Sequence, residues 1–415
     1  MKIKWVPLML VLAAILRLGL ADITENQAQH DEDFDNGFDT MSRTYSERAS
    51  LYKSSSSARA SFDASNMVTS TKRQLADKSS RDFYDWLDRM GNTSSAPATP
   101  GRKNMELAKR KLKGAHVTFI IVAKDGSGKV RTVQAAVNLV PNNNNRNVII
   151  FIKKGIYREK VFVPKTKPFI TFQGEGATST FIEWGDTAST KGPEGQPLGT
   201  KGSASVAIEA VHFKAIDISF RNTAPAPPGG AVGKQAVALR IAGDMAAFYG
   251  VSFFGAQDTL YDHEGRHYFL DCYIEGSIDF IFGDGRSFYE RCHLHSIASP
   301  FGSITAQHRL TPKEQTGFSI YNSLVTGTGT IYLGRAWGAS SRVVYSFTYF
   351  ADIILPQGWF DWNFPSREKT VFYGEYKCFG PGANRLGRVK WSRMLTAAQA
   401  KPFLTIGFIN GEQWL

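Results

Sequence analysis

The chain has 415 residues, enough for one large domain with extensions or for two ordinary domains, and 42% of its residues are hydrophobic, which supports a sizeable core. Its formal net charge of +12 indicates an anionic partner, such as nucleic acid, acidic lipid or acidic polysaccharide, unless the basic surface serves only solubility. It contains only three cysteines, which excludes a fold that depends on a disulfide scaffold.

The first 21 residues have the pattern of a secretory signal peptide. Lys2 and Lys4 precede a short apolar run, and the small residues that end at Ala21 offer a cleavage site. The run is too short to span a bilayer comfortably, although it would act as an anchor if it were not cleaved. No later segment is apolar enough to cross a membrane. We therefore predict a soluble, secreted protein that has no membrane association after signal cleavage.

Residues 22–114 form a polar N-terminal extension, first acidic and then rich in serine. Few large apolar residues occur in it, so it cannot bury enough surface to offset the entropy lost on ordering. We predict that this extension is largely disordered. Asn92 lies in an Asn-Thr-Ser sequence and is predicted to be glycosylated.

The predicted globular domain spans residues 115–415. Short β-rich runs punctuated by glycine and proline occur early in it, at residues 117–122, 148–152, 160–163, 169–172 and 181–184. We predict a helix at 130–139 that caps the first coil, a turn at 326–330, and a final helix at 396–400 that covers the last coil.

Gln235, Gln257 and Asp279 recur at a fixed interval of 22 residues. A parallel β-solenoid returns its chain to the same face every roughly 20–25 residues, about 4.8 Å along the axis. The three side chains are therefore predicted to form a ladder on one outer face. A β-sandwich would also contain many short strands, but it would not favour a sustained period, so it is the minor alternative.

The residues around this ladder could carry ester hydrolysis. Asp258 follows Gln257, and two carboxylates on neighbouring coils tend to share one proton, which provides a nucleophile or base together with an acid. Arg335 would orient one carboxylate, and the amides of Gln235 and Gln257 suit an oxyanion. Carboxylate attack on an ester carbonyl fits these residue types. The alternative is a purely structural stack of like residues.

One geometric condition applies to this site. In a regular strand Gln257 and Asp258 would point to opposite faces, so both can serve one site only at a strand end or a bend.

The cysteines and histidines provide no clear ligand cluster. Cys272 and Cys292 are separated by 20 residues, close to one coil, so they could form a disulfide or remain buried free thiols. His263 and His267 have the spacing of helical metal ligands but fall in predicted strand or turn. We therefore predict no metal and no cofactor.

Several ordered segments resemble the signature segments of plant-type pectin methylesterases. They comprise residues 155–159 (Gly-Ile-Tyr-Arg-Glu), 235–239, 255–260, 279–283, 333–337, and 373–376 followed by 380–383. The resemblance extends from about residue 117 to the C-terminus, and the order of the segments makes it specific.

This resemblance implies an all-β fold, a right-handed single-stranded parallel β-helix, that hydrolyses methyl esters of galacturonate units in pectin and releases methanol. Asp279 would be the nucleophile, and Asp258 would protonate the departing methanol and then activate water. Gln257 and Gln235 would hold the oxyanion, and Arg335 would orient Asp279.

The resemblance also implies a substrate groove. Trp337 would pack against a sugar ring, and Tyr157 is assigned to substrate binding with its motif. Phe282 and Trp359 would line the groove, unless they pack in the core. The expected partners are methyl-esterified homogalacturonan in the cell wall and a proteinaceous pectinesterase inhibitor. Nucleic acid is not expected, and we predict a monomer.

The chain departs from the family pattern at several positions. Ala336 replaces the usual Pro, which is expected to loosen the turn that aims Arg335. The Asp284–Gly285–Arg286 segment begins where the common plant form has Asn-Ala, which adds charge. Ser323 replaces a cysteine of many members, and the N-terminal extension is unlike their inhibitor-like pro-region.

Two other functions are alternatives to ester hydrolysis. A non-catalytic pectin-binding β-helix is disfavoured because Asp258 and Asp279 are both present. A glycosidase or lyase on the same fold is disfavoured because a pair of glutamines suits acyl transfer better.

Overall fold

The computed structural model describes residues 118–228 and 231–415, so the predicted signal peptide, nearly all of the predicted extension and Asn92 lie outside the described residues. The account below concerns one compact unit, formed by residues 118–226 and 233–415. In these parts of the chain no helix is long and apolar enough to cross a membrane.

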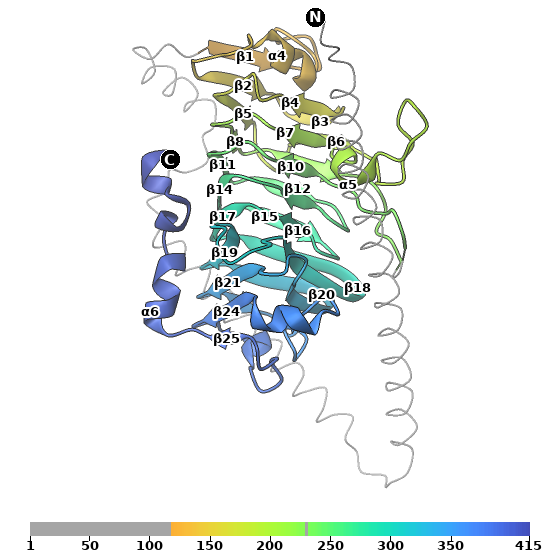
Figure 1. Ribbon diagram of the computed structural model, residues 1–415. Helices are drawn as coiled ribbons and strands as arrows, with labels where there is room; N and C mark the ends of the chain where they lie inside the picture. Colours follow the sequence, from red (N-terminus) through yellow and green to blue (C-terminus); the bar gives the residue numbers. More distant parts are fainter. Residues whose placement is uncertain (1–117, 229–230) are drawn as a thin grey trace, which may run out of the picture. The chain divides into compact units, whose positions relative to one another are not determined.

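Successive coils of the chain stack in parallel to build the first sheet (Figure 1). Its strands, in spatial order, are β1 (Thr118–Val122), β2 (Val148–Ile152), β5 (Ile170–Gly174), β8 (Lys214–Ile216), β11 (Ala246–Tyr249), β14 (Arg266–Leu270), β17 (Arg286–Glu290), β19 (Gly317–Tyr321), β21 (Arg342–Ser346), β24 (Phe372–Tyr376) and β25 (Arg393–Met394). Every neighbouring pair in this sheet is parallel.

The second sheet supplies the other two faces. One face contains β3 (Gly155–Arg158), β6 (Thr180–Trp184), β9 (Ser219–Asn222), β12 (Ser252–Phe254) and β15 (Tyr273–Gly276), and the other contains β4 (Val161–Val163), β7 (Val206–Ile208), β10 (Leu239–Ile241), β13 (Leu260–Asp262) and β16 (Ile281–Gly283). The long strand β18 (His293–Gln307) joins both faces, and β20 (Leu324–Arg335) pairs with it and with β22 (Tyr349–Phe350) and β23 (Trp359–Phe360). This is a right-handed parallel β-helix, and a β-sandwich is excluded.

The interior is a continuous stack of apolar side chains that alternate with outward residues along each strand. In β2, for example, Val148, Ile150 and Ile152 are buried, and the residues between them are partly exposed. Aromatic rings stack from coil to coil, with Phe248 and Phe269 at 4.7 Å and Phe269 and Tyr289 at 4.4 Å between ring centroids. This one core holds the coils in register.

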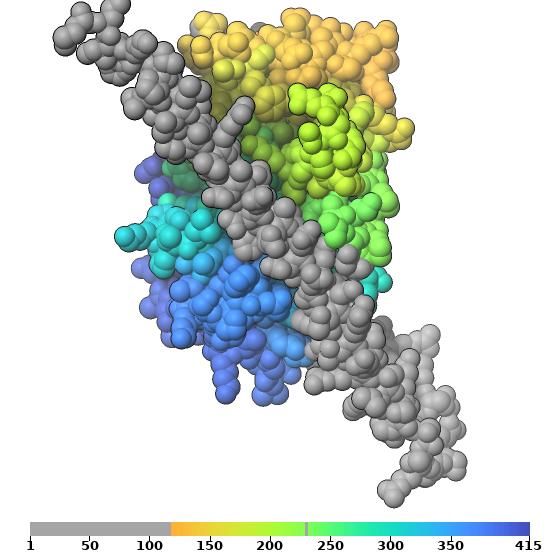
Figure 2. Space-filling view, turned by 45° about the vertical axis from the view of Figure 1, so that its right-hand side comes forward, coloured from red at the N-terminus to blue at the C-terminus, as the bar shows by residue number. Residues whose placement is uncertain are grey.

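One short helix covers the N-terminal end of the described β-helix, and another packs on the side of the first sheet. Helix α4 (Val133–Leu139) begins after the cap residue Thr132 and buries Val133, Ala136 and Val137. It confirms the helix predicted at 130–139, with a start three residues later. Helix α6 (Ala397–Ala400) is capped by Thr396 in a reciprocal pair of hydrogen bonds with Gln399, which confirms a helix at the predicted position. Its buried Ala400 packs in the cluster on the side of the first sheet, so the helix does not cover the last coil as predicted. Helix α5 (Gly199–Gly202) lies in the long excursion between β6 and β7, which stands out in yellow-green in Figure 2.

The C-terminal residues continue from α6 as three short 3-10 helices, η3 (Lys401–Phe403), η4 (Ile406–Ile409) and η5 (Gly411–Gln413). We call residues 397–413 the C-terminal strap. It lies beside the first sheet in Figure 1, and its Phe403, Phe408 and Ile409 form a second apolar cluster with Tyr268 and Phe288. Two further 3-10 helices, η1 (Pro365–Lys369) and η2 (Pro381–Ala383), precede the strap in the chain.

The predicted turn at 326–330 is wrong, because these residues lie inside β20. Gly327 pairs with Ser296 of β18, and a Cβ atom at Gly327 would overlap the Ser296 carbonyl oxygen. The glycine therefore permits a close approach between two strands rather than a reversal of the chain.

Candidate active site

Asp258 and Asp279 occupy equivalent positions on neighbouring coils. Asp258 lies between β12 and β13, and Asp279 lies between β15 and β16. Both have left-handed backbone conformations, with φ of 65° and 47°, and both are buried. Since Leu260 pairs with Ile281, the two aspartates, each two residues earlier, are also in register. Their backbones are therefore about 4.8 Å apart along the axis.

The predicted ladder of residues 22 apart is wrong. Leu239 pairs with Leu260 and Leu260 with Ile281, so a coil is 21 residues long here. Residues 22 apart are therefore offset by one position at each successive coil. Gln257 accordingly pairs with Ile278 rather than with Asp279. The true vertical pair on this corner is Asp258 and Asp279.

The condition that Gln257 and Asp258 lie at a bend is met. Both residues are outside the regular strands, and the left-handed φ of Asp258 redirects the chain between β12 and β13. The Asp258 amide donates to the Ile278 carbonyl at 3.0 Å, which ties this bend to the coil that carries Asp279. The usual alternation of side chains therefore does not separate the two residues.

The Asp279 carboxylate is held on both oxygens. Arg335 donates through Nε to Oδ1 at 2.8 Å and through Nη2 to Oδ2. Ser303 donates its hydroxyl to Oδ1 and accepts the Asp279 amide at 3.0 Å. Asp279 is 6% exposed and Arg335 is 3% exposed, so this ion pair is largely shielded from water. A bidentate pair in such surroundings fixes the direction of the carboxylate.

Aromatic side chains line the outer side of this corner. Phe282 stacks on Tyr261 with ring centroids 4.3 Å apart, and the partly exposed Trp337 lies 6.1 Å from Phe282. Trp362 lies under the Arg335 guanidinium at 4.3 Å, a cation–π contact. Phe282 is only 4% exposed, so Trp337, which lies beside it, is the ring of this pair that presents an open face near Arg335.

Two residues assigned to substrate binding lie in the interior instead. Trp359 is 1% exposed, stacks on Tyr373 at 4.3 Å and directs its indole N–H to Glu375. Tyr157 is 2% exposed, and its hydroxyl donates to the Lys153 carbonyl at 2.9 Å. Neither ring can contact a sugar, so both assignments are wrong; both positions point inward on their strands.

Gln235 is half-buried and lies in the excursion before β10. Its carbonyl accepts the Ala188 amide at 2.8 Å, and the next residue, Ala236, donates its amide to Gln257 at 3.1 Å. These bonds place Gln235 next to the coil of Gln257. Its role at an oxyanion stays a prediction.

Cys272 and Cys292 lie on neighbouring coils, as their spacing suggested, but they form no disulfide. Both are buried free thiols, and Cys378 is free as well. The Cys272 and Cys292 thiols face the carbonyls of Phe248 and Phe269 at 3.6 and 3.5 Å. The free-thiol alternative therefore holds.

His263 and His267 have separate surroundings. His267 is fully buried, with Nδ1 at 2.5 Å from Asp262 Oδ1, and Tyr289 donates to the other oxygen of Asp262 at 2.5 Å. The His263 ring instead contacts Tyr261 at 4.5 Å, and burial lowers the pKa of His263 to about 4. Among the described residues, no group of three or more His, Cys, Asp or Glu side chains could hold a metal ion.

The departures from the family pattern have structural explanations. The Ala336 amide donates to the Phe360 carbonyl at 2.9 Å, so this residue adds a bond that Pro could not make and does not loosen the segment that aims Arg335. A Cβ atom at Gly285 would overlap Asp262 Oδ1, so the Asp262 network requires glycine there. Burial raises the pKa of Asp284 to about 6, although Thr316 and Gln307 donate hydrogen bonds to it.

Sequence reasoning missed Ser303, Trp362 and the Asp262–His267–Tyr289 network. Ser303 could have been found from register, because Ile281 pairs with Thr305 and Ser303 is therefore level with Asp279. The connection between these coils is longer than the preceding one, which hides the relation in the sequence.

Residues 119–412 match the sequence model of the Pectinesterase family. The chain is 54% identical to Pectinesterase QRT1 of Arabidopsis thaliana over 298 residues, 71% of this chain and 78% of that protein. It is 47% identical to Probable pectinesterase 8 of the same plant over 72% of this chain and 76% of that protein.

Solved structures are similar as well. A pectin methylesterase from carrot superposes with a TM-score of 0.66 and 37% identity, over 71% of this chain and 94% of that one. A pectin methylesterase solved in complex with a hexasaccharide superposes with a TM-score of 0.61 and 28% identity, over 70% of this chain and 96% of that one.

Proposed function

Because this chain belongs to the pectinesterase family and hydrolyses methyl esters of pectin, we propose that Asp279 is the nucleophile of the reaction. The observation that carries the proposal is the fixed Asp279 carboxylate, bound by Arg335 and Ser303 and level with Asp258. A buried carboxylate held in one orientation meets the main geometric need of covalent ester hydrolysis.

The reaction proceeds in two steps. An Asp279 oxygen attacks the ester carbonyl of a galacturonate unit, and the amides of Gln257 and Gln235 stabilise the oxyanion. Asp258 donates a proton to the methoxide as the ester C–O bond breaks, which releases methanol and leaves an anhydride with Asp279. Asp258, now a carboxylate, takes a proton from water, and the hydroxide cleaves the anhydride. Arg335 stays bound to Asp279 and keeps it aimed.

The substrate groove contains Trp337, supported by the buried Phe282, and pectin lies against Trp337. Two solved hexasaccharide complexes of structurally similar pectin methylesterase, one of them with a mutant protein, support this substrate class. No step needs a metal or a cofactor, because the charges that develop are met by amides and by Arg335. Treatment with a chelator is expected to leave the rate unchanged.

We propose the remaining features of the protein from its sequence. Residues 1–21 direct secretion to the cell wall, residues 22–114 are an extension and residues 115–415 are the catalytic domain. The protein is a monomer that carries a glycan on Asn92 and binds a proteinaceous inhibitor.

Methanol release from highly methylated pectin tests the nucleophile. Asp279→Asn is expected to lower kcat at least about 1,000-fold while pectin chain length stays unchanged, because an amide cannot form the anhydride. Asp352→Asn, at an exposed aspartate, is the matched control and should behave as wild type. Full activity in a folded Asp279→Asn protein would refute the assignment.

Ser303 acts as a positioning residue for Asp279. Ser303→Ala is expected to lower kcat about tenfold at unchanged KM, since it loses one hydrogen bond to the carboxylate, and Ser303→Thr should recover part of the rate. Steady-state kinetics on pectin checks this. A rise in KM with unchanged kcat would mean that Ser303 supports substrate binding instead.

A further inference from the structure

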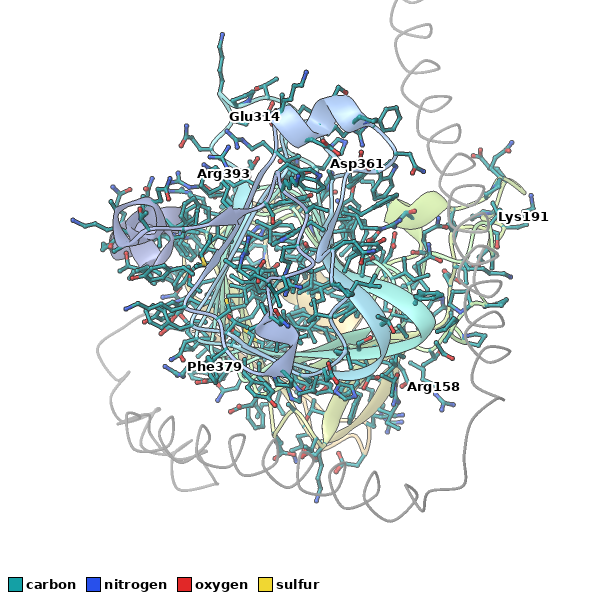
Figure 3. The ribbon with its side chains drawn as sticks, turned by 90° about the horizontal axis from the view of Figure 1, so that it is seen from below. Arg158, Lys191, Glu314, Asp361, Phe379 and Arg393 are labelled. Atoms are coloured by element: carbon teal, nitrogen blue, oxygen red, sulfur yellow. The ribbon has the colours of Figure 1, made fainter. Side chains whose placement is uncertain are left out.

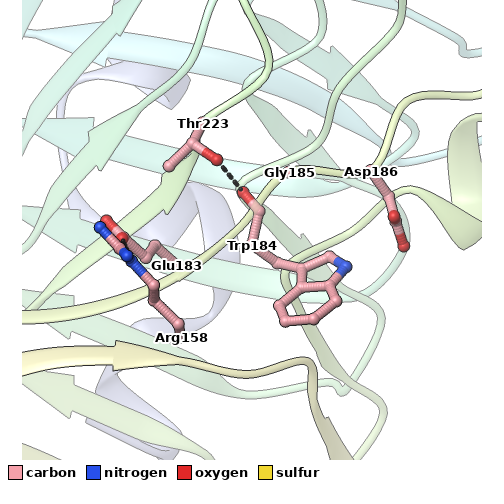
Figure 4. A pocket seen from close by; sticks show the side chains of 6 residues that line it. All are labelled: Arg158, Glu183, Trp184, Gly185, Asp186 and Thr223. Atoms are coloured by element: carbon pink, nitrogen blue, oxygen red, sulfur yellow. Dashed lines mark hydrogen bonds and ion pairs between the residues drawn. The ribbon is translucent and has the colours of Figure 1, made fainter.

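A cleft of about 400 Å³ lies at the ends of β6 and β3, outside the residues assigned to catalysis. It is lined by Arg158, Glu183, Trp184, Gly185, Asp186 and Thr223. Figure 4 shows the Trp184 indole between the Arg158–Glu183 pair and the Asp186 carboxylate. An accessible aromatic face flanked by charged groups is the composition of a carbohydrate site.

Trp184 and Arg158 are the two groups in the cleft that are available to a ligand. Trp184 is 38% exposed, unusual for so large an apolar ring, and the Arg158 side chain is 76% exposed. Arg158 uses its Nε to bind Glu183 at 2.8 Å. Within residues 118–228 and 231–415, its terminal NH₂ groups have no hydrogen-bond partner. Those two groups form a fork that matches a carboxylate.

The other charged groups of the cleft are already paired. Glu183 accepts from Arg158 and also from Arg221 at 2.8 Å. Burial alone would raise the pKa of Glu183, but the two arginines outweigh it and lower that pKa, so the carboxylate stays ionised. Lys160 donates to Asp186 at 2.6 Å. Three cations thus face two carboxylates, which leaves one positive charge for an anionic ligand.

The cleft lies on the corner that carries the catalytic aspartates. Trp184 pairs with Asn222, and the following pairings run from β9 to β12 and from β12 to β15. Asp258 and Asp279 follow β12 and β15, so the cleft is two coils from the first and three from the second. Three coils correspond to about 14 Å along the axis. A polymer bound at Asp279 can span that distance.

We propose that this cleft is a subsite for an un-esterified galacturonate unit of the pectin chain whose methyl ester is hydrolysed at Asp279. The inference rests on the proposed function, and it adds a preference for substrate that already contains free acid groups. The sugar ring stacks on Trp184, and its carboxylate binds the free fork of Arg158. A methyl ester at this position would lack the charge that Arg158 selects.

Kinetics on matched substrates tests the subsite. Trp184→Ala and Arg158→Gln are compared with Phe379→Ala, at a ring of similar exposure, and with Arg393→Gln; Figure 3 labels Arg158, Phe379 and Arg393 at separate positions around the axis. The substrates are fully methyl-esterified pectin, partly de-esterified pectin of the same length, and a methyl-esterified trimer. Each cleft variant should raise KM about fivefold on partly de-esterified pectin alone, with kcat unchanged.

The outcomes separate this inference from the proposed nucleophile. Unchanged KM in both cleft variants would overturn the subsite, and so would an equal rise on fully esterified pectin, because the carboxylate would then play no part. Binding of de-esterified oligogalacturonate to the Asp279→Asn protein, with and without Trp184→Ala, provides a readout without turnover. If Asp279→Asn stays active, the nucleophile fails while the binding comparison still decides the cleft.

Discussion

At the scale of single residues, the site depends on backbone conformations that L-residues seldom adopt. Asp258 and Asp279 both have positive φ, which costs roughly 1 kcal/mol each for a residue with a side chain. The hydrogen bonds from Ser303 and Arg335 offset this cost at Asp279. These conformations interrupt the regular alternation of side chains and place Asp258 and Asp279, on neighbouring coils, at the same corner of the β-helix.

Asp284 makes stability depend on pH. Its pKa of about 6 lies above the 3.8 of an unperturbed aspartate, so the protonated form favours the fold. The stabilisation is present in full below about pH 4 and is lost as the pH rises through 6. Asp284→Asn, neutral at every pH, should be about 1 kcal/mol more stable than wild type at pH 7.5 and equal to it at pH 4, after allowance for partial exposure.

Urea unfolding at the two pH values measures this difference, with Asp352→Asn as the control at an exposed aspartate. A stability gain that is the same at both pH values would show that ionisation of Asp284 is not its cause.

At the scale of the elements, the segment after β16 is shaped by the interior of the β-helix. Asp262 of β13 binds His267 and Tyr289 inside the coil, and its carboxylate fills the space beside Gly285. Glycine at position 285, where the common plant form has alanine, is thus required by the buried polar groups around Asp262 on the neighbouring coil. Ala336, in place of the usual Pro, is explained by a neighbouring coil as well, because its amide donates a hydrogen bond to the Phe360 carbonyl.

Gly285→Ala tests this relation. The added methyl would overlap Asp262 Oδ1 and disturb three buried polar residues, so we expect a loss of about 2–3 kcal/mol in the free energy of unfolding. Gly407→Ala is the control, because its neighbours are the side-chain tips of Thr405 and Glu412 at 3.1 and 3.3 Å. Equal losses in the two variants, measured by denaturant unfolding, would contradict the explanation.

Several strands and two helices of the domain were predictable from pattern, but the continuous strand β20, the helix α5 and the register were not. The run at 148–152 matches β2, and the helices at 130–139 and 396–400 exist because their caps and apolar faces are local. Coil length is set by turns that vary from coil to coil. The interval of 22 residues therefore predicted that Gln257 and Asp279 stack on each other. The pairing of Leu260 with Ile281 excludes that stack.

The site was predictable only where its residues carry the motif. Asp279 and Arg335 are in contact as the resemblance implied, whereas Ser303 belongs to none of the segments that carry it. Tyr157 lies within such a segment and Trp359 lies outside them, yet both rings point inward. The side of a strand on which a ring lies depends on where the preceding bend falls. The sequence alone does not locate that bend, so the direction of these rings could not be predicted.

At the scale of the whole molecule, the net charge of +12 should hold the enzyme on its acidic product. Retention on a polygalacturonate column should fall steeply between about 0.1 and 1 M salt, where the Debye length shrinks from about 10 Å to about 3 Å. Retention on a neutral polysaccharide column is the control. Binding to polygalacturonate that is indifferent to salt would mean that contacts other than charge hold the enzyme.

The C-terminal strap changes how the coils of this repeat protein depend on one another. In a plain solenoid each coil contacts only its neighbours, so coils can be lost singly from an end. Here Phe403 and Phe408 pack across coils from Tyr268 to Phe372, and the Phe403 carbonyl accepts the Ser319 hydroxyl at 2.6 Å. The coils of Asp279 and Arg335 lie in this fastened part, whereas those of β2 and β5 do not. We therefore expect the coils that carry Asp279 and Arg335 to unfold together, whereas the coils of β2 and β5 can be lost singly.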